Sequence, residues 1–125
     1  MKKQVITDQA PAAIGPYSQA IDSDGLVFCS GQIALDHRSG HLISGGIEAE
    51  IRCAMGNVTE VLRAAGLGLE SIIKTTIFLV DLRDFDIVNR IYDEHFEPPY
   101  PARSTVQVTA LPRGARVEIE AIARR

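Results

Sequence analysis

Apolar residues recur every three or four positions after Ile47, and this spacing predicts an amphipathic helix of about four to five turns. The charged residues Glu48, Glu50 and Arg52 are expected mostly on its polar side. Gly66 is placed to end the helix, since glycine readily takes the left-handed conformation that follows a last turn.

A second helical pattern follows, with Asp81 or Asp84 as the predicted N-cap. Prolines at 98, 99 and 101 prevent the helix from continuing, because the residue before a proline is driven out of the helical region. The predicted packing stripe consists of Phe85, Val88, Ile91, Tyr92 and Phe96.

Shorter runs of β-branched and apolar residues, separated by glycine and proline, predict strands. A hairpin is expected around DSDG, where Gly25 can take a positive φ. The run at 71–80 is apolar on both faces, which predicts a central strand. The last two strands are expected to pair across the turn LPRG. The predicted strands span residues 2–6, 17–21, 26–35, 71–80, 104–111 and 115–123.

Apart from the short edge strand at 2–6, the pattern is ββαβαββ, which predicts an α+β fold with both helices on one face of an antiparallel or mixed sheet. At 125 residues and 46% hydrophobic side chains, the chain is expected to form one domain, residues 1–125. No segment remains to cover the second sheet face. Since the strands carry apolar residues there too, a closed homo-oligomer is expected.

Charge and composition exclude several classes of protein. The net charge of −3 supplies no field that would draw the chain to nucleic acid or an anionic membrane, although residues 101–125 hold five arginines against two glutamates. The N-terminus lacks an apolar signal core and no run is long enough to span a bilayer, so a soluble cytoplasmic protein is expected. Cys29 and Cys53 lack metal or redox spacing, which favours two buried free thiols over a disulfide.

Charged residues in the last two strands are the main candidates for chemistry. Alternation places Glu118 and Glu120 on one face of the last strand, and Arg103 is expected to face them from the neighbouring strand. A solvated strand face, or a structural salt bridge, explains these charges without any function. The functional alternative is a site in which arginine grips a carboxylate in two places while a glutamate orients water or moves a proton.

Other candidates are individually ordinary. Tyr17 can be a packed aromatic, Ser30 a hydroxyl satisfied by backbone, and Gly31 either a β-bulge or a place where a ligand approaches the backbone. His37 and His41 have helical ligand spacing, but the glycine-containing turn between them and the missing third ligand favour a surface loop over a metal site.

Several motifs, in order over essentially the whole chain, together resemble the RidA family, also called YjgF, of reactive-imine deaminases. The motifs are APAAIGPYSQAI, SGQI, AAG, KTTIFLVDLRDF, VN, PARSTV and VEIEAIA. The resemblance implies a chorismate-mutase-like subunit of the bacillus type and a homotrimer whose sheets form an inner barrel, with three sites between subunits. It also implies no metal and no bound cofactor.

The implied reaction is attack of water on the C=N bond of 2-imino acids, which releases a 2-keto acid and ammonia. Substrates such as 2-iminopropanoate form from 2-aminoacrylate, a product of pyridoxal-phosphate enzymes acting on serine or threonine. The resemblance makes Arg103 the carboxylate clamp and Glu118 the residue that orients water and manages protons. It implies that Tyr17 relays a proton or holds water, and that the Gly31 N–H donates to an oxygen of the substrate carboxylate.

The same resemblance adds Ser30, Asn89 and Thr105 to the substrate-binding set. Thr105 stands where many family members have cysteine, which removes a reactive thiol and leaves substrate preference open. Two alternative functions remain: an endoribonuclease or translation inhibitor, and a trimer that binds small molecules or acts as a chaperone without turnover. The absence of a basic–aromatic stripe argues against binding and cleavage of RNA. Glu118 favours an enzyme that turns over its ligand above a protein that only binds it.

Overall fold

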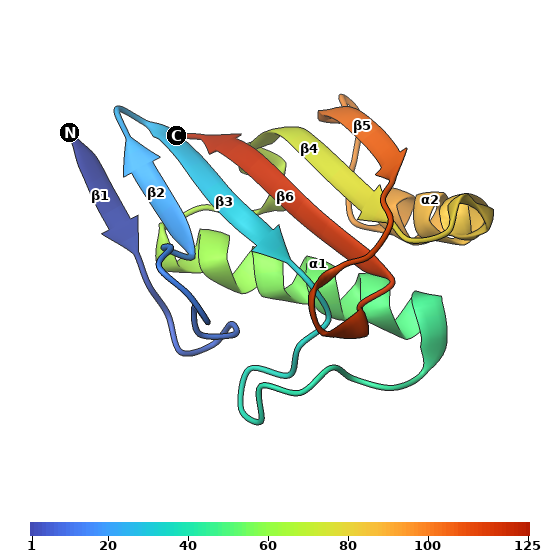
Figure 1. Cartoon of the computed structure of the whole chain (residues 1–125). Helices are drawn as coiled ribbons and strands as arrows, with labels where there is room; N and C mark the ends of the chain where they lie inside the picture. The colour runs from blue at the N-terminus through green and yellow to red at the C-terminus, as the bar shows by residue number, and fades with distance from the viewer.

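Six strands form one mixed sheet in the order β1-β2-β3-β6-β4-β5 (Figure 1). The computed structural model describes all residues from 1 to 125. Every neighbouring pair is antiparallel except β4 and β5, which run parallel. The strands are β1 (Lys2–Val5), β2 (Ala20–Ser23), β3 (Leu26–Gln32), β4 (Ile72–Leu79), β5 (Ala102–Gln107) and β6 (Val117–Arg124).

Two helices lie on the same face of this sheet: α1 (Gly46–Ala64), which crosses β3 and β6, and α2 (Phe85–Glu94), beside β4 and β5 (Figure 1). Gly66 follows α1 with a φ of 78°, which confirms its predicted place at the helix end. Short 3₁₀ turns occur at η1 (Leu69–Ser71), η2 (Leu82–Asp84) and η3 (Pro112–Gly114). No helix is both long and apolar enough to cross a membrane.

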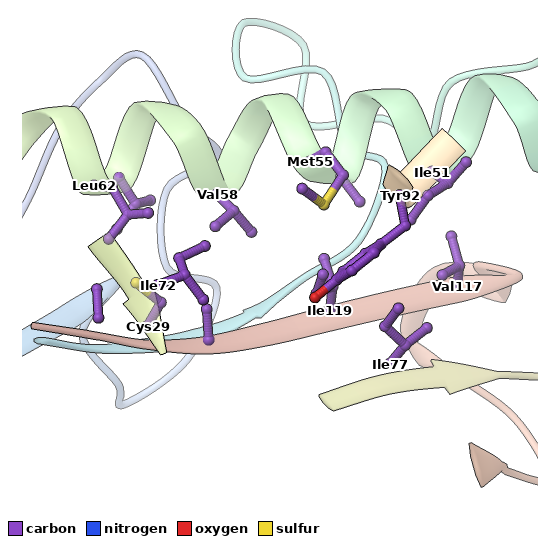
Figure 2. Packing of buried hydrophobic residues seen from close by; sticks show 14 of the residues in the cluster. Cys29, Ile51, Met55, Val58, Leu62, Ile72, Ile77, Tyr92, Val117 and Ile119 are labelled. Carbon is purple, nitrogen blue, oxygen red and sulfur yellow. The ribbon is translucent and has the colours of Figure 1, made fainter. Parts of the chain in front are cut away.

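The core fills the space between α1 and the sheet, where apolar side chains from both layers meet (Figure 2). Because helical residues at three- and four-residue spacing share a face, α1 delivers one continuous stripe into this layer. Each strand contributes every second residue. The side chains labelled in Figure 2 are Cys29, Ile51, Met55, Val58, Leu62, Ile72, Ile77, Tyr92, Val117 and Ile119.

The opposite face of the sheet has no helix over it and still carries large apolar side chains. Phe28 is 44% exposed and Val106 is 43% exposed. Their neighbours along β3 and β5 point to the other side of the sheet. A small hollow on this face is lined in part by Phe28, Lys74 and Glu120. The chain by itself therefore leaves one sheet face uncovered, as the sequence pattern predicted.

The predicted pairing of the last two strands is wrong. Strand β6 lies between β3 and β4, and β5 pairs with β4 alone, at the edge of the sheet. The LPRG segment forms η3 rather than a hairpin turn, with Arg113 at a φ of 62°. The connection carries the chain past β4, where the amide of Val80 donates to the carbonyl of Arg116.

Two further expectations need correction. The strand predicted at 26–35 ends at Gln32, after an irregularity in its pairing with β6 between Cys29 and Gln32. Glu50, predicted on the polar side of α1, is only 4% exposed. It occupies the apolar stripe three positions after Ile47, and its carboxylate has a backbone partner there.

Candidate functional site

Arg103 lies on the edge strand β5, and its guanidinium packs against aromatic rings of α2. Its Cζ is 5.0 Å from the ring centroid of Tyr92 and 5.8 Å from that of Phe85. The Tyr92 hydroxyl is hydrogen-bonded at 2.8 Å to Oγ1 of the buried Thr75, which is the cross-strand partner of Arg103. Stacking on fixed rings holds the planar donor fork in one orientation.

No ion pair neutralises Arg103, so the structural salt bridge considered from the sequence does not form within the chain. A guanidinium stacked on aromatic rings without an anionic partner is suited to bind an anion brought by a ligand. The cleft around it has a volume of about 300 Å³. Its lining residues are Asn89, Tyr92, Asp93, Tyr100, Pro101 and Arg103.

Thr105 follows on the same side of β5, since residues two apart on a strand share a face. Its Oγ1 is buried and has no hydrogen-bond partner in the chain. Buried hydroxyls are normally satisfied, so an unpaired one beside an unpaired arginine is a candidate contact for a polar ligand. Asn89 lines the cleft together with Arg103, so two of the predicted binding residues share it, and Thr105 follows Arg103 on the same side of β5.

Glu118 lies in a different, smaller pocket, of about 60 Å³, near Tyr17 and Gly31. Its side chain extends over Gly31: a Cβ added at that glycine would be 2.7 Å from Cδ and from Oε1 of Glu118. Gly31 lies in the irregular stretch where β3 departs from regular pairing with β6. The missing side chain at position 31 thus makes room for the carboxyl group.

Burial raises the pKa of the Glu118 carboxyl, and the nearby Glu120 carboxylate raises it further. Both causes disfavour the charged form, the first through lost hydration and the second through like-charge repulsion. A carboxyl whose pKa is moved toward neutral pH can both accept and return a proton. This is the electrostatic behaviour that a general acid–base residue needs.

Tyr17 lines the pocket beside Glu118, and Ser30 contacts the loop that carries Tyr17. The Tyr17 hydroxyl accepts a hydrogen bond of 3.3 Å from the Ile14 amide, and its side chain remains 48% exposed. The Ser30 hydroxyl donates to the Ser18 carbonyl at 2.6 Å, so its proton is already used to hold the preceding loop against β3. A direct substrate contact by Ser30 stays a prediction, while its positioning of the Tyr17 loop is visible.

Arg103 and Glu118 project from opposite faces of the sheet. Arg103 pairs with Thr75 and Glu118 pairs with Phe78, and these two β4 residues are an odd number of positions apart. Thr75 faces α2, so Arg103 lies on the helix side of the sheet. Val117 and Ile119 are buried on the helix side, and Glu118, which lies between them along β6, points to the opposite, uncovered face. One chain therefore contains two half-sites: the arginine cleft (Asn89 and Arg103, with Thr105 beside Arg103 on β5) and the glutamate pocket (Tyr17, Gly31, Glu118).

Sequence reasoning missed two buried polar residues of α1 that hold the glutamate pocket in place. Oε1 of Glu50 accepts a 2.9 Å hydrogen bond from the Arg116 amide, two residues before Glu118. Nδ2 of Asn57 donates to the carbonyls of Ile33 and Leu35, at 3.1 Å each. Their position inside an otherwise apolar helical stripe was the available signal.

These features define a small α+β subunit that presents a cleft with an unpaired arginine and a pocket with a half-buried glutamate on different faces. The chain belongs to the endoribonuclease L-PSP family, whose model matches residues 7–125. A mouse relative named 2-iminobutanoate/2-iminopropanoate deaminase is 50% identical, over 98% of this chain and 91% of the relative. The human protein of the same name is 47% identical, over 98% of this chain and 90% of its own length. The RidA resemblance seen in the sequence is thereby confirmed.

Solved structures agree with this assignment. RidA from an Antarctic Psychrobacter superposes with a TM-score of 0.95 at 39% identity, covering 98% of this chain and 99% of that one. The Escherichia coli protein TdcF, solved with bound serine, superposes with a TM-score of 0.91 at 43% identity, covering 98% of each chain. The fold is therefore the fold of this family.

Proposed function

We propose that this protein is a 2-iminobutanoate/2-iminopropanoate deaminase, which hydrolyses reactive imines to 2-keto acids and ammonia. The observation that carries the proposal is the unpaired, ring-stacked Arg103, together with a glutamate whose pKa is raised. Relatives at 47–50% identity over nearly the whole chain bear this name, and TdcF was solved with an amino acid bound. The proposed location is the cytoplasm, where eliminating pyridoxal-phosphate enzymes supply the imines.

Arg103 takes the substrate carboxylate in the proposed reaction. Two parallel N–H···O bonds to a carboxylate fix both its position and its plane, and so place the adjacent C=N carbon. Asn89 supplies a further polar contact in the same cleft, and the unpaired Thr105 hydroxyl supplies one next to Arg103 on β5. The amide of Gly31 is proposed to contact the carboxylate from the other half-site.

Glu118 moves the protons of the proposed reaction. As a carboxylate it accepts a proton from water while the water oxygen bonds to the imine carbon, and it returns this proton to the nitrogen as the C=N double bond becomes a single bond. The resulting carbinolamine collapses when Glu118 takes the hydroxyl proton and passes it to the amine nitrogen: the C–N bond breaks, ammonia leaves, and the C=O bond of the keto acid forms. Tyr17, at the rim of the same pocket, is proposed to hold the water.

The two half-sites meet in this proposal only when chains associate. A homotrimer of chorismate-mutase-like subunits, with the bare sheet faces forming an inner barrel, would cover the exposed Phe28 and Val106. It would also bring the glutamate pocket of one subunit to the arginine cleft of the next. Burial of an apolar sheet face is the driving force for this assembly.

The decisive experiment generates 2-aminoacrylate in situ with a serine or threonine dehydratase and measures keto-acid release. Wild type should accelerate release over buffer, while Arg103→Ala and Glu118→Ala should each lose about 100-fold or more in kcat/KM. No acceleration by wild type would overturn the deaminase proposal. Full activity in Arg103→Ala would overturn the site assignment.

A mixing experiment tests whether the site is shared between chains. Arg103→Ala and Glu118→Ala chains, co-refolded in equal amounts, should recover activity because about a quarter of randomly assembled interfaces join an intact Arg103 to an intact Glu118. Each variant refolded alone is the control and should stay inactive. An inactive mixture that has assembled normally would mean that each site uses residues of one chain.

The arginines near the C-terminus give little support to an RNA-cleaving function. Arg125 is paired with Asp22 at 2.8 Å, and Nη1 of Arg113 donates to the Gly40 carbonyl. Both arginines are therefore already engaged within the chain, one by a residue of β2 and the other by the loop that contains Gly40. Nucleic-acid binding relies on several unpaired cations along one groove.

A further inference from the structure

The cleft that holds Arg103 also contains a carboxylate, on Asp93. Asn89 and Asp93 are four residues apart on α2, so they lie on the same side of the helix, about 6 Å apart along its axis. Tyr100, from the segment that leads into β5, closes the same cleft. The cleft is thus larger than an arginine contact alone requires, and it contains a second charge of opposite sign.

Asp93 is held in place by Tyr100. The Tyr100 hydroxyl donates a 2.5 Å hydrogen bond to Oδ1 of Asp93. This bond, together with desolvation and the charge of Asp93, raises the pKa of the Tyr100 phenol, so the phenol remains a donor throughout the neutral range. The other oxygen of Asp93 has no partner in the chain and is available to a ligand.

Asp93 and Arg103 do not pair with each other, although both line this cleft. An arginine and an aspartate that share a cleft without pairing are suited to bind a ligand with charges at both ends. The arginine binds its anionic end and the aspartate binds its cationic end. In a 2-imino acid the anion is the carboxylate held by Arg103, and the remaining group that can reach the cleft wall is the side chain.

We propose that Asp93 and Tyr100 form a side-chain subsite that favours 2-imino and 2-keto acids ending in a cation, such as a guanidinium, and disfavours those with a second carboxylate. This inference rests on the proposed function and deepens it, by assigning a substrate class to the same cleft. Tyr100 acts as a positioning residue, because it fixes the carboxylate that meets the ligand.

Equilibrium binding of stable keto acids tests the subsite without requiring catalysis. Titration calorimetry would compare pyruvate, 2-ketoglutarate and 5-guanidino-2-ketopentanoate on wild type and on Asp93→Asn. Each exposed charge contact changes affinity by about three- to fivefold, so wild type should bind the guanidino acid about tenfold more tightly than 2-ketoglutarate. In Asp93→Asn this ratio should fall to about one, with pyruvate unchanged within about twofold.

Two further variants separate the subsite from other effects. Asp86→Asn removes the same charge from an exposed position on the same helix outside the cleft, and should keep the wild-type ratio. Tyr100→Phe frees Asp93 and should lower the ratio by about threefold. An unchanged ratio in Asp93→Asn, or an equal loss for pyruvate and the guanidino acid, would overturn the proposal.

The same variants assayed on arginine-derived and alanine-derived imines, made with an amino-acid oxidase, connect binding to turnover. The ratio of kcat/KM values should follow the ratio of affinities. Failure of wild type to hydrolyse any imine would overturn the proposed function while the binding ratios still decide the subsite. Normal hydrolysis with no side-chain discrimination would overturn the subsite alone.

Discussion

The carboxyl group of Glu118 lies over the backbone of Gly31, at the place that a side chain at position 31 would occupy. The contacting atoms, Cδ and Oε1, belong to the end of a flexible side chain, whereas the β3 and β6 backbones hold their positions. A methyl group at Gly31 would therefore be accommodated by rotation of Glu118 away from its pocket.

Gly31→Ala is expected to separate activity from stability. Because only the end of Glu118 must move, the free energy of unfolding should change by less than about 1 kcal/mol, while kcat should fall at least about tenfold. Thermal unfolding and keto-acid release measure the two quantities. Gly56→Ala, where an added Cβ meets no atom within 4 Å, is the matched control and should keep full activity. An active Gly31→Ala enzyme would show that the position of Glu118 does not matter.

The raised pKa of Glu118 predicts the acid side of the activity profile. If the carboxylate is the proton acceptor, kcat should rise with pH through the elevated pKa of Glu118, above the range of an ordinary glutamate. Glu120→Gln removes the second cause of the shift and should move this limb to lower pH. If the pH at which kcat rises is unchanged in Glu120→Gln, a group other than Glu118 controls the rate.

The same shift predicts how Glu118 affects stability. Between its unfolded and folded pKa values the native state holds a proton that the unfolded chain has released, so its contribution to stability falls as pH rises through that interval. Glu118→Gln carries no such penalty. Its stability relative to wild type should therefore increase with pH across the interval and then level off, as measured by urea unfolding at several pH values.

Thr105→Val tests the buried hydroxyl beside Arg103. The two side chains have similar volume, and the wild-type hydroxyl has no partner in the chain. Its removal should raise the free energy of unfolding by about 1 kcal/mol. If the hydroxyl contacts the ligand, the Kd for pyruvate should rise severalfold in the same variant. Thr105→Ser, which keeps the hydroxyl, provides the comparison; equal pyruvate affinity in all three proteins would remove Thr105 from the binding set.

Glu50 is expected to act as a positioning residue for Glu118. Glu50→Leu leaves the Arg116 amide without an acceptor and should cost about 1–3 kcal/mol of stability. It should also lower kcat more than it changes pyruvate affinity, because β6 begins just after this bond. Glu50→Gln retains an oxygen acceptor and should recover most of both losses. A Gln variant as impaired as the Leu variant would show that the charge, not the bond, is required.

Much of the fold could be predicted because residue periodicity reports which face a side chain occupies. The stripe after Ile47 gave α1, and the two-sided apolar run at 71–80 gave β4, which does have a strand on each side. Gly25, at a φ of 87°, confirms the predicted hairpin turn. These features depend on neighbours in sequence, where local conformational rules apply.

Strand order could not be read in the same way. Alternation shows that Arg103 shares a face with Thr105, but it does not show which strand lies beside β5. The turn residues of LPRG are compatible with a hairpin and with the η3 turn that leads β6 into the middle of the sheet. As a result, the predicted candidate residues lie in two groups. The prediction that Arg103 and Glu118 face each other within one chain was wrong.

The placement of Arg103 and Glu118 on opposite sheet faces has a consequence for when the protein can act. On the proposed mechanism an isolated chain contains both chemical groups and can use neither, so turnover appears only once chains have associated. Activity would then obey mass action, vanishing on dilution below the dissociation constant of the assembly and returning on concentration. A newly synthesised chain would be inactive until it assembled with other copies, and the concentration of the protein in the cell would set the fraction that is assembled and active.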